Sequence, residues 1–233
     1  MIRIQTFTSK GNRAENQDFI AYQQIGDESG IFVVADGMGG YEHGDIAAKV
    51  VAESIVESVS LNWSPDVPSK ILADAMYYAN ESLSLKRIAL GGCKMGAVVC
   101  ALILLDGKAY MSWLGDSRVY HYSDRIENFC TKDHSMAREL LKINSLKASE
   151  IEKYSNIVTR SIMGSVNMDQ LEMEVRDCKP GDSFILCTDG LHKSISMPIR
   201  LKDDFCKTLL DRGDDFNDNA TCVIVDMVAA NKE

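Results

Sequence analysis

Five aspartates in this chain each stand where an apolar, strand-like run begins or ends. They are far apart along the 233 residues: Asp18, Asp36, Asp116, Asp189 and Asp218. Carboxylates that meet at one end of a sheet raise one another's pKa, so such a cluster stays ionised only when cations neutralise it. Oxygen ligands suit hard divalent ions, and two ions bridged by one aspartate would also activate a water molecule. The pattern therefore predicts a binuclear metal site with hydrolytic chemistry.

The strongest of these signals is the stretch IFVVADGMGG at residues 31–40. An apolar run that ends in a glycine cluster is typical of a buried strand followed by a tight loop, which places Asp36 on a rigid support. A phosphate-binding P-loop is excluded because no Lys lies between Asp36 and Gly44. A dinucleotide fingerprint is excluded because Glu42 stands where its third glycine belongs.

The elements that must position these acids follow from hydrophobic periodicity. A helix is expected over residues 44–59, and a second begins at Pro68, a residue that suits the first turn of a helix. The Asp106-Gly107 pair between two apolar runs predicts a hairpin, and residues 95–129 as a whole predict an antiparallel meander. Helices in the first half with strands throughout favour an α+β fold with packed sheets. Further strands are expected at 2–8, 19–25, 31–36, 171–175, 183–188 and 221–227, and a helix at 135–142.

Composition restricts the class of protein. The net charge of −9 argues against nucleic acid or an anionic membrane as a partner, and no run is long enough to span a bilayer. The N-terminus lacks the apolar core of a signal peptide. Seven cysteines without a C-x-x-C pair indicate reduced core thiols of a cytoplasmic protein, and Cys187, inside an apolar strand, is not expected to be catalytic. The four histidines are expected at the surface or at caps rather than as ligands.

Taken together, the motifs resemble the metal-dependent serine/threonine phosphatases of type 2C, the PPM family, in their compact bacterial form. The resemblance extends from Gly11 to Val225, and its most specific feature is the occurrence of four short motifs in one order. The matching segments are GNRAENQD (11–18), VVADGMGG (33–40), HGDIAA (43–48), KMGAVV (94–99), WLGDSRVY (113–120), TKDHS (131–135), VTRSIMG (158–164), GDSFILCTDGL (181–191) and DNATCVIV (218–225).

The resemblance implies a fold and a set of metal ligands. The fold is a central antiparallel β-sandwich flanked by helices on both sides, with residues 1–233 as a single catalytic domain. Two Mn²⁺ or Mg²⁺ ions are expected at one end of it. By position, Asp36 bridges them, Gly37 offers its carbonyl, Asp189 and Asp218 hold the first ion, and Asp18 supports the second through water.

The remaining roles implied by the resemblance concern the substrate. Arg13 is expected to bind the phosphate, Asp116 with Asp189 to form a weaker third metal site, and residues 136–158 to form a flap beside the site. Position 38 is Met, where many relatives have a histidine proposed as general acid, so water is the candidate proton donor. The short stretch between Asp189 and Asp218 indicates a reduced helical flank, and Arg118 is expected to be a structural ion-pair partner.

These features imply hydrolysis of phosphoserine and phosphothreonine in proteins by a metal-activated bridging water. The expected partners are phosphorylated targets of a serine/threonine kinase, and the chain is expected to be a monomer. One alternative is a catalytically impaired family member that acts as a phosphoprotein-binding module. It is disfavoured because the four core acids, Asp18, Asp36, Asp189 and Asp218, are all present. A small-molecule phosphatase on the same fold would share this metal chemistry.

Overall fold

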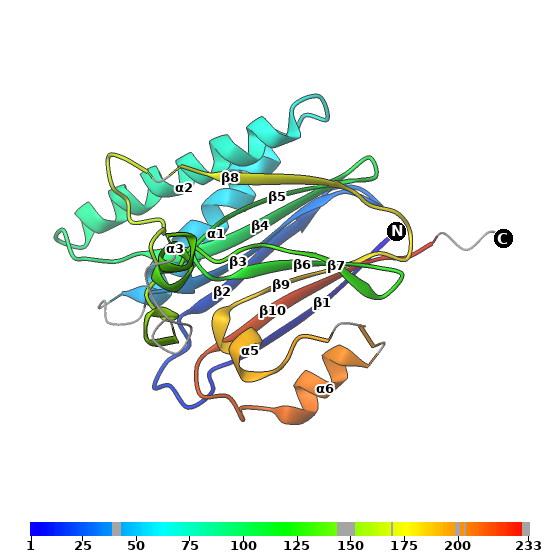
Figure 1. Cartoon of the computed structure of the whole chain (residues 1–233). Helices are drawn as coiled ribbons and strands as arrows, with labels where there is room; N and C mark the ends of the chain where they lie inside the picture. The colour runs from blue at the N-terminus through cyan, green and yellow to red at the C-terminus, as the bar shows by residue number, and fades with distance from the viewer. Residues whose placement is uncertain (39–42, 144–151, 169, 199–200, 203, 230–233) are drawn as a thin grey trace.

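The computed structural model is organised around two five-stranded antiparallel sheets that pack face to face (Figure 1). It describes residues 1–38, 43–143, 152–168, 170–198, 201–202 and 204–229. Two parts of the sequence-based predictions therefore lie outside the described residues: the glycines at 39 and 40, and residues 144–151 of the expected flap.

Each sheet combines strands from distant parts of the chain. Sheet A has the order β1 (Ile2–Ser9), β10 (Ala220–Met227), β9 (Ser183–Cys187), β6 (Arg118–Ser123) and β7 (Ile126–Cys130). Sheet B has the order β2 (Asp18–Gln24), β3 (Gly30–Gly37), β4 (Ala97–Leu105), β5 (Lys108–Leu114) and β8 (Glu172–Asp177). Strands β10 and β3 lie inside their sheets, so the two motifs that contain Asp218 and Asp36 approach from opposite halves of the sandwich.

The alternation of side chains along β3 explains the layers. Successive side chains of a strand point to opposite faces of its sheet. Ile31 and Val33 pack with the helices α1 (Gly44–Leu61) and α2 (Pro68–Ala89), whereas Phe32 and Val34 pack between the sheets. The outer face of sheet A is covered by α5 (Asp189–Ser194) and α6 (Phe205–Arg212). The predicted β-sandwich with helices on both sides is confirmed (Figure 1).

One of the predictions about elements is wrong. Residues 95–129 do not form one meander, because β4 and β5 belong to sheet B whereas β6 and β7 belong to sheet A. The chain crosses between the sheets at Gly115, whose φ of +112° favours glycine. The flank between Asp189 and Asp218 contains two short helices, α5 and α6.

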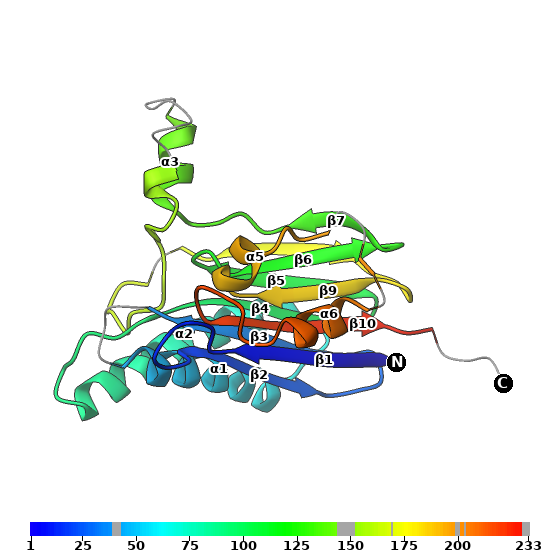
Figure 2. The ribbon, with the colours of Figure 1, turned by 90° about the horizontal axis from the view of Figure 1, so that it is seen from below.

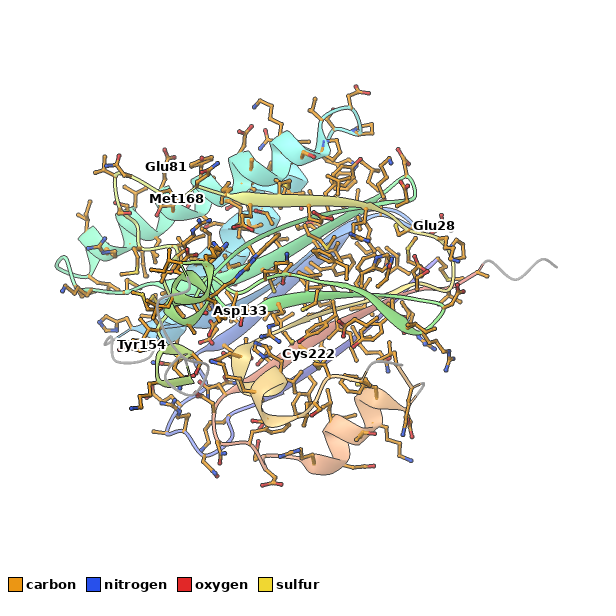
Figure 3. The ribbon with its side chains drawn as sticks, in the orientation of Figure 1. Glu28, Glu81, Asp133, Tyr154, Met168 and Cys222 are labelled. Atoms are coloured by element: carbon orange, nitrogen blue, oxygen red, sulfur yellow. The ribbon has the colours of Figure 1, made fainter. Side chains whose placement is uncertain are left out.

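The described cysteines and helices agree with the compositional predictions. All seven cysteines are free thiols, and five of them are buried, including Cys187 in β9 and Cys222 in β10 (Figure 3). Within the described part of the chain, no helix is both long enough and apolar enough to cross a bilayer.

The segment expected to form the flap leaves the body of the molecule. Its first part is α3 (Met136–Lys142), where the Ser135 side chain accepts a hydrogen bond from the Arg138 amide at the helix N-terminus. Figure 2 shows α3 standing away from both sheets. A short 3₁₀ helix, η1 (Glu152–Tyr154), leads the chain back. In Figure 3, Tyr154 lies at one end of the molecule and Glu28 at the opposite end.

Gly37→Ala tests how closely β3 and α1 are packed. A Cβ at position 37 would lie 2.1 Å from the carbonyl oxygen of Gly44, a backbone atom at the start of α1. Because helix and strand must separate to relieve this clash, we expect the free energy of unfolding to fall by about 1–3 kcal/mol. The measurement is urea unfolding without metal. Gly26→Ala is the matched control, since its Cβ meets only the rotatable Ser29 hydroxyl. An unfolding free energy equal to that of the wild type would contradict the packing described here.

Candidate metal centre

Two of the predicted acids face each other across neighbouring strands. Asp18 opens β2 and Asp36 lies near the end of β3, and the two are direct partners in the antiparallel register. Residues placed directly opposite in this way have Cβ atoms about 4.5–5.5 Å apart, and like charges there destabilise a sheet. Asp18 is buried, whereas Asp36 keeps part of its surface on a cavity.

Most of the other predicted site residues line one cavity beside Asp36. It measures about 380 Å³ and lies where β3, β5, β9 and β10 end or begin. Asp189 reaches it as the first residue of α5, directly after β9, and Asp218 reaches it from the loop before β10. The predicted residues that line it are Arg13, Asp36, Gly37, Asp116, Asp189 and Asp218. Asp18 lies behind Asp36 and is not part of the lining, in keeping with the supporting role predicted for it.

Asp18 has one satisfied and one unsatisfied carboxylate oxygen. The Thr188 hydroxyl donates to its Oδ2 at 2.9 Å, whereas its buried Oδ1 has no hydrogen-bond partner among the described residues. Burial, with the charges of Asp189 and Asp218, raises the Asp18 pKa to about 7, against the hydrogen bond from Thr188 that lowers it. A buried carboxylate oxygen without a partner is costly, so this atom fits a cation or a water molecule held by one.

The other acids are perturbed in the same direction. Burial, followed by the charges of Asp18 and Asp189, raises the pKa of Asp36 well above its usual range. Burial and the charge of Asp189 raise the pKa of Asp116 to about 6. Carboxylates packed this closely ionise together only when positive charge is supplied. Because all these donors are oxygen atoms, the set fits hard divalent ions such as Mn²⁺ or Mg²⁺.

The chain supplies some of this positive charge itself. Arg13 Nη2 lies 2.7 Å from Asp218 Oδ2, and Lys193 Nζ lies 2.7 Å from Asp189 Oδ2 and 3.2 Å from Asp116 Oδ2. Within the described ranges, no three Asp, Glu, His or Cys side chains already form a group that could hold a metal ion. These ion pairs use one oxygen of each carboxylate, Oδ2, so Asp218 and Asp189 each have a second oxygen that the pairs do not use.

Several residues that sequence reasoning did not select hold the site in shape. The Asn219 side chain accepts from the Gln17 amide at 2.9 Å and donates to the Lys10 and Glu15 carbonyls at 2.8 and 2.9 Å. It thereby fixes the loop that carries Arg13. Asn219 adjoins Asp218 in the DN-x-T motif, which was the only sequence signal for it. Lys193 follows Asp189 by four residues, a spacing that places the two on one helix face.

The prediction for the histidines is wrong for three of them. His121, His134 and His192 are buried rather than at the surface. His192 Nε2 lies 2.9 Å from the Asp116 carbonyl oxygen, and burial lowers its pKa to about 4. No histidine is among the described residues that line the cavity. Arg118 is confirmed as a structural ion-pair partner, because its guanidinium binds both carboxylate oxygens of Asp133 at 2.7 and 2.8 Å.

Asp36→Asn tests the electrostatic cost of the cluster. When folding raises the pKa of a carboxyl group, the free energy of unfolding of the protein falls as the pH rises from the unfolded pKa to the folded pKa. The reason is that the folded state binds the proton more tightly than the unfolded state and must release it. In EDTA at pH 8, we therefore expect the free energy of unfolding of the variant to exceed that of the wild type. The difference should be at least about 1.4 kcal/mol, which corresponds to one pKa unit. The difference should be smaller at pH 5.

The measurement is urea unfolding at both pH values. Asp106→Asn is the control, since it neutralises an exposed carboxylate in the β4–β5 turn. An Asp36→Asn variant that is no more stable than the wild type at pH 8 would show that the cluster carries no such cost.

Comparison with known proteins identifies the family to which this chain is similar. A family model described as protein phosphatase 2C matches residues 9–221. A protein of Streptococcus pyogenes assigned to the protein phosphatase 2C type is 31% identical over a 194-residue alignment that covers 79% of this chain and 76% of that protein. Protein phosphatase PhpP of Streptococcus pneumoniae is 29% identical over 84% of this chain and 81% of its own length.

Solved structures agree with the fold. The serine/threonine phosphatase of S. agalactiae superposes with a TM-score of 0.80 at 26% identity, over 98% of this chain and all of that one. The catalytic domain of the serine/threonine protein phosphatase PstP, solved in complex with two manganese ions, superposes with a TM-score of 0.78 at 22% identity, over 98% and 99% of the two chains. Sequence motifs, fold and family model agree, and this chain belongs to the protein phosphatase 2C family of metal-dependent serine/threonine phosphatases.

Proposed function

We propose that this chain removes phosphate from serine and threonine residues of proteins at a site where Asp36, Asp189 and Asp218 bind two divalent cations. The observation that carries the proposal is the facing pair of Asp18 and Asp36, placed at the wall of the cavity that Asp189 and Asp218 also line. Asp36 and the Gly37 carbonyl would hold the ions together with Asp189 and Asp218, and Asp18 would support them. The two manganese ions in the PstP structure support Mn²⁺, and Mg²⁺ prefers the same oxygen ligands.

The chemistry follows from what the cavity contains. The two cations would supply the positive charge that acidifies the attacking water and offsets the charge of the phosphate. Among the described lining residues there is no cysteine, serine, threonine or histidine, so no thiol, hydroxyl or imidazole nucleophile lies there, and the lining aspartates are committed to the cations in this proposal. Direct attack by water is therefore favoured. Met38 also lines the cavity and has no proton to give, which leaves protonation of the departing oxygen to water.

The strand end that carries Asp36 is held firmly. The Gly37 amide donates to the Gln17 carbonyl at 2.9 Å, and the Met38 amide donates to the Gly96 carbonyl at 3.0 Å. These bonds fix Asp36 from both neighbouring segments, so the carboxylate can orient its ligands without moving. Such fixed geometry lowers the barrier because the reacting groups are already positioned.

Arg13 is the residue that we assign to the substrate phosphate. Its side chain is 56% exposed at the rim of the cavity, and only one of its nitrogens is bonded to Asp218 in the described structure. A guanidinium has five donors in a planar fork that matches two phosphate oxygens, so Arg13 retains donors for a ligand while it contacts Asp218.

We further propose the biological setting from the same features. The substrates are proteins that a serine/threonine kinase has phosphorylated. The protein is a cytoplasmic monomer, and it binds neither nucleic acid nor membrane. The free thiols support a reducing compartment. The assignment of residues 136–158 to a flap within the single catalytic domain is supported by their described part, since Asn156 and Val158 line the cavity.

Steady-state kinetics of Arg13→Ala test the assignment with a phosphothreonine peptide and saturating Mn²⁺. Loss of a charge-assisted contact of roughly 1.5–3 kcal/mol corresponds to about a 10- to 150-fold loss of kcat/KM. Because the contact is made equally in the ground and transition states, we expect KM to rise more than kcat falls, and inhibition by inorganic phosphate to weaken in parallel. Arg13→Lys should recover only part of the loss, since an ammonium cannot bind two oxygens as a fork.

Arg3→Ala is the matched control, because Arg3 is similarly exposed and pairs with Asp226 at 2.8 Å. An unchanged KM and unchanged phosphate inhibition in Arg13→Ala would show that Arg13 is a surface residue that does not bind the substrate phosphate. A wild-type protein that binds the peptide without turnover in Mn²⁺ or Mg²⁺ would favour the phosphoprotein-binding module. Rapid turnover of small phosphate esters with none of phosphopeptides would favour a small-molecule phosphatase.

A further inference from the structure

Lys193 makes contacts that an ordinary helix-surface lysine does not make. Its Nζ lies 2.7 Å from Asp189 Oδ2, 3.2 Å from Asp116 Oδ2 and 3.1 Å from Asn156 Oδ1. These three oxygens come from α5, from the loop after β5 and from the segment expected to form the flap. The side chain of Asp116 is only 5% exposed, and that of Lys193 is 35% exposed, so the contact is half enclosed.

Lys70 gives the ordinary case within the same chain. It pairs with Asp74 one helical turn away on α2, and both side chains are more than half exposed. Such pairs contribute little, because solvent screens them. The pair of Lys193 and Asp189 has the same spacing of four residues, but Lys193 has two further acceptors on other segments. Helix-surface pairing therefore does not account for its position.

Asp116 and Asp189 are the two acids to which the family resemblance assigns a weaker third metal site. An ammonium carries three N–H donors, and three oxygens surround Lys193 Nζ. A divalent cation held between Asp116 and Asp189 would lie about 2.0–2.6 Å from their oxygens, in the space between the two carboxylates where the ammonium already contacts one oxygen of each. The ammonium and the cation would then occupy the same space with charges of the same sign. The residues present do not fit a third ion.

We propose that Lys193 supplies, as a fixed side-chain charge, the positive charge that a third divalent ion would bring between Asp116 and Asp189. The proposal rests on the two-cation site described above and limits that site to two ions. The 3.1 Å bond from Lys193 to Asn156 also links the segment expected to form the flap to α5.

The test is the number of Mn²⁺ ions bound per chain, measured by equilibrium dialysis and by calorimetry. We expect two ions for the wild type and two for Lys193→Arg, which keeps the charge. We expect three for Lys193→Asp, because that change replaces the cation by a third carboxylate beside Asp116 and Asp189. Lys70→Asp is the matched control: it places an acid one helical turn from Asp74 on the exposed face of α2, and it should stay at two.

A second variant guards against misfolding. If Lys193→Asp fails to fold in far-ultraviolet circular dichroism, Lys193→Ala is used, which frees the same two acids and should bind a third ion at millimolar Mn²⁺. Three ions in the wild type, or two in a folded Lys193→Asp or Lys193→Ala variant, would overturn the proposal while the two-cation site stands. No bound ion in the wild type would overturn the two-cation site itself, and the proposal with it.

Discussion

The repulsion between two carboxylates placed opposite each other in a sheet is the constraint on which the rest of this structure depends. Asp18 and Asp36 are register partners where β2 begins and β3 ends, and burial raises the pKa of both. Such a pair of like charges destabilises the sheet unless positive charge lies beside it. The arginine and lysine that approach Asp218 and Asp189 supply part of that charge, and divalent ions are the remaining source.

The sandwich brings these groups together because its strands end at one place. The motifs with Asp36 and Asp218 come from different sheets, and the inner core between the sheets fixes their distance. Two polar contacts then join the sheets at the site itself: the Thr188 hydroxyl, after β9, donates to Asp18 in β2, and Asn219 binds the loop before β2. Mutations at Thr188 or Asn219 would therefore act on the site without contacting the phosphate.

The sequence was informative where periodicity or a turn pair is strong. It predicted β3, α1, α2 and the β4–β5 hairpin, because apolar spacing and the Asp106-Gly107 pair are local signals. It failed where the outcome depends on tertiary contacts. The change of sheet at Gly115 depends on how the sheets pack, and α5, with six residues, is too short to show a helical period. The acids could be chosen from strand ends and the family resemblance, but the partners of Asp116 could not, since Lys193 and His192 meet it only in the fold.

Electron paramagnetic resonance of the protein loaded with two equivalents of Mn²⁺ tests the central claim most directly. If Asp36 bridges two ions, they lie about 3.5–4 Å apart, as in other two-metal sites, and their spins must couple. We predict a broad spectrum of a coupled pair, which changes to that of isolated ions or of free Mn²⁺ in Asp36→Asn. A wild-type spectrum made only of isolated Mn²⁺ signals would contradict a site built around the facing carboxylates.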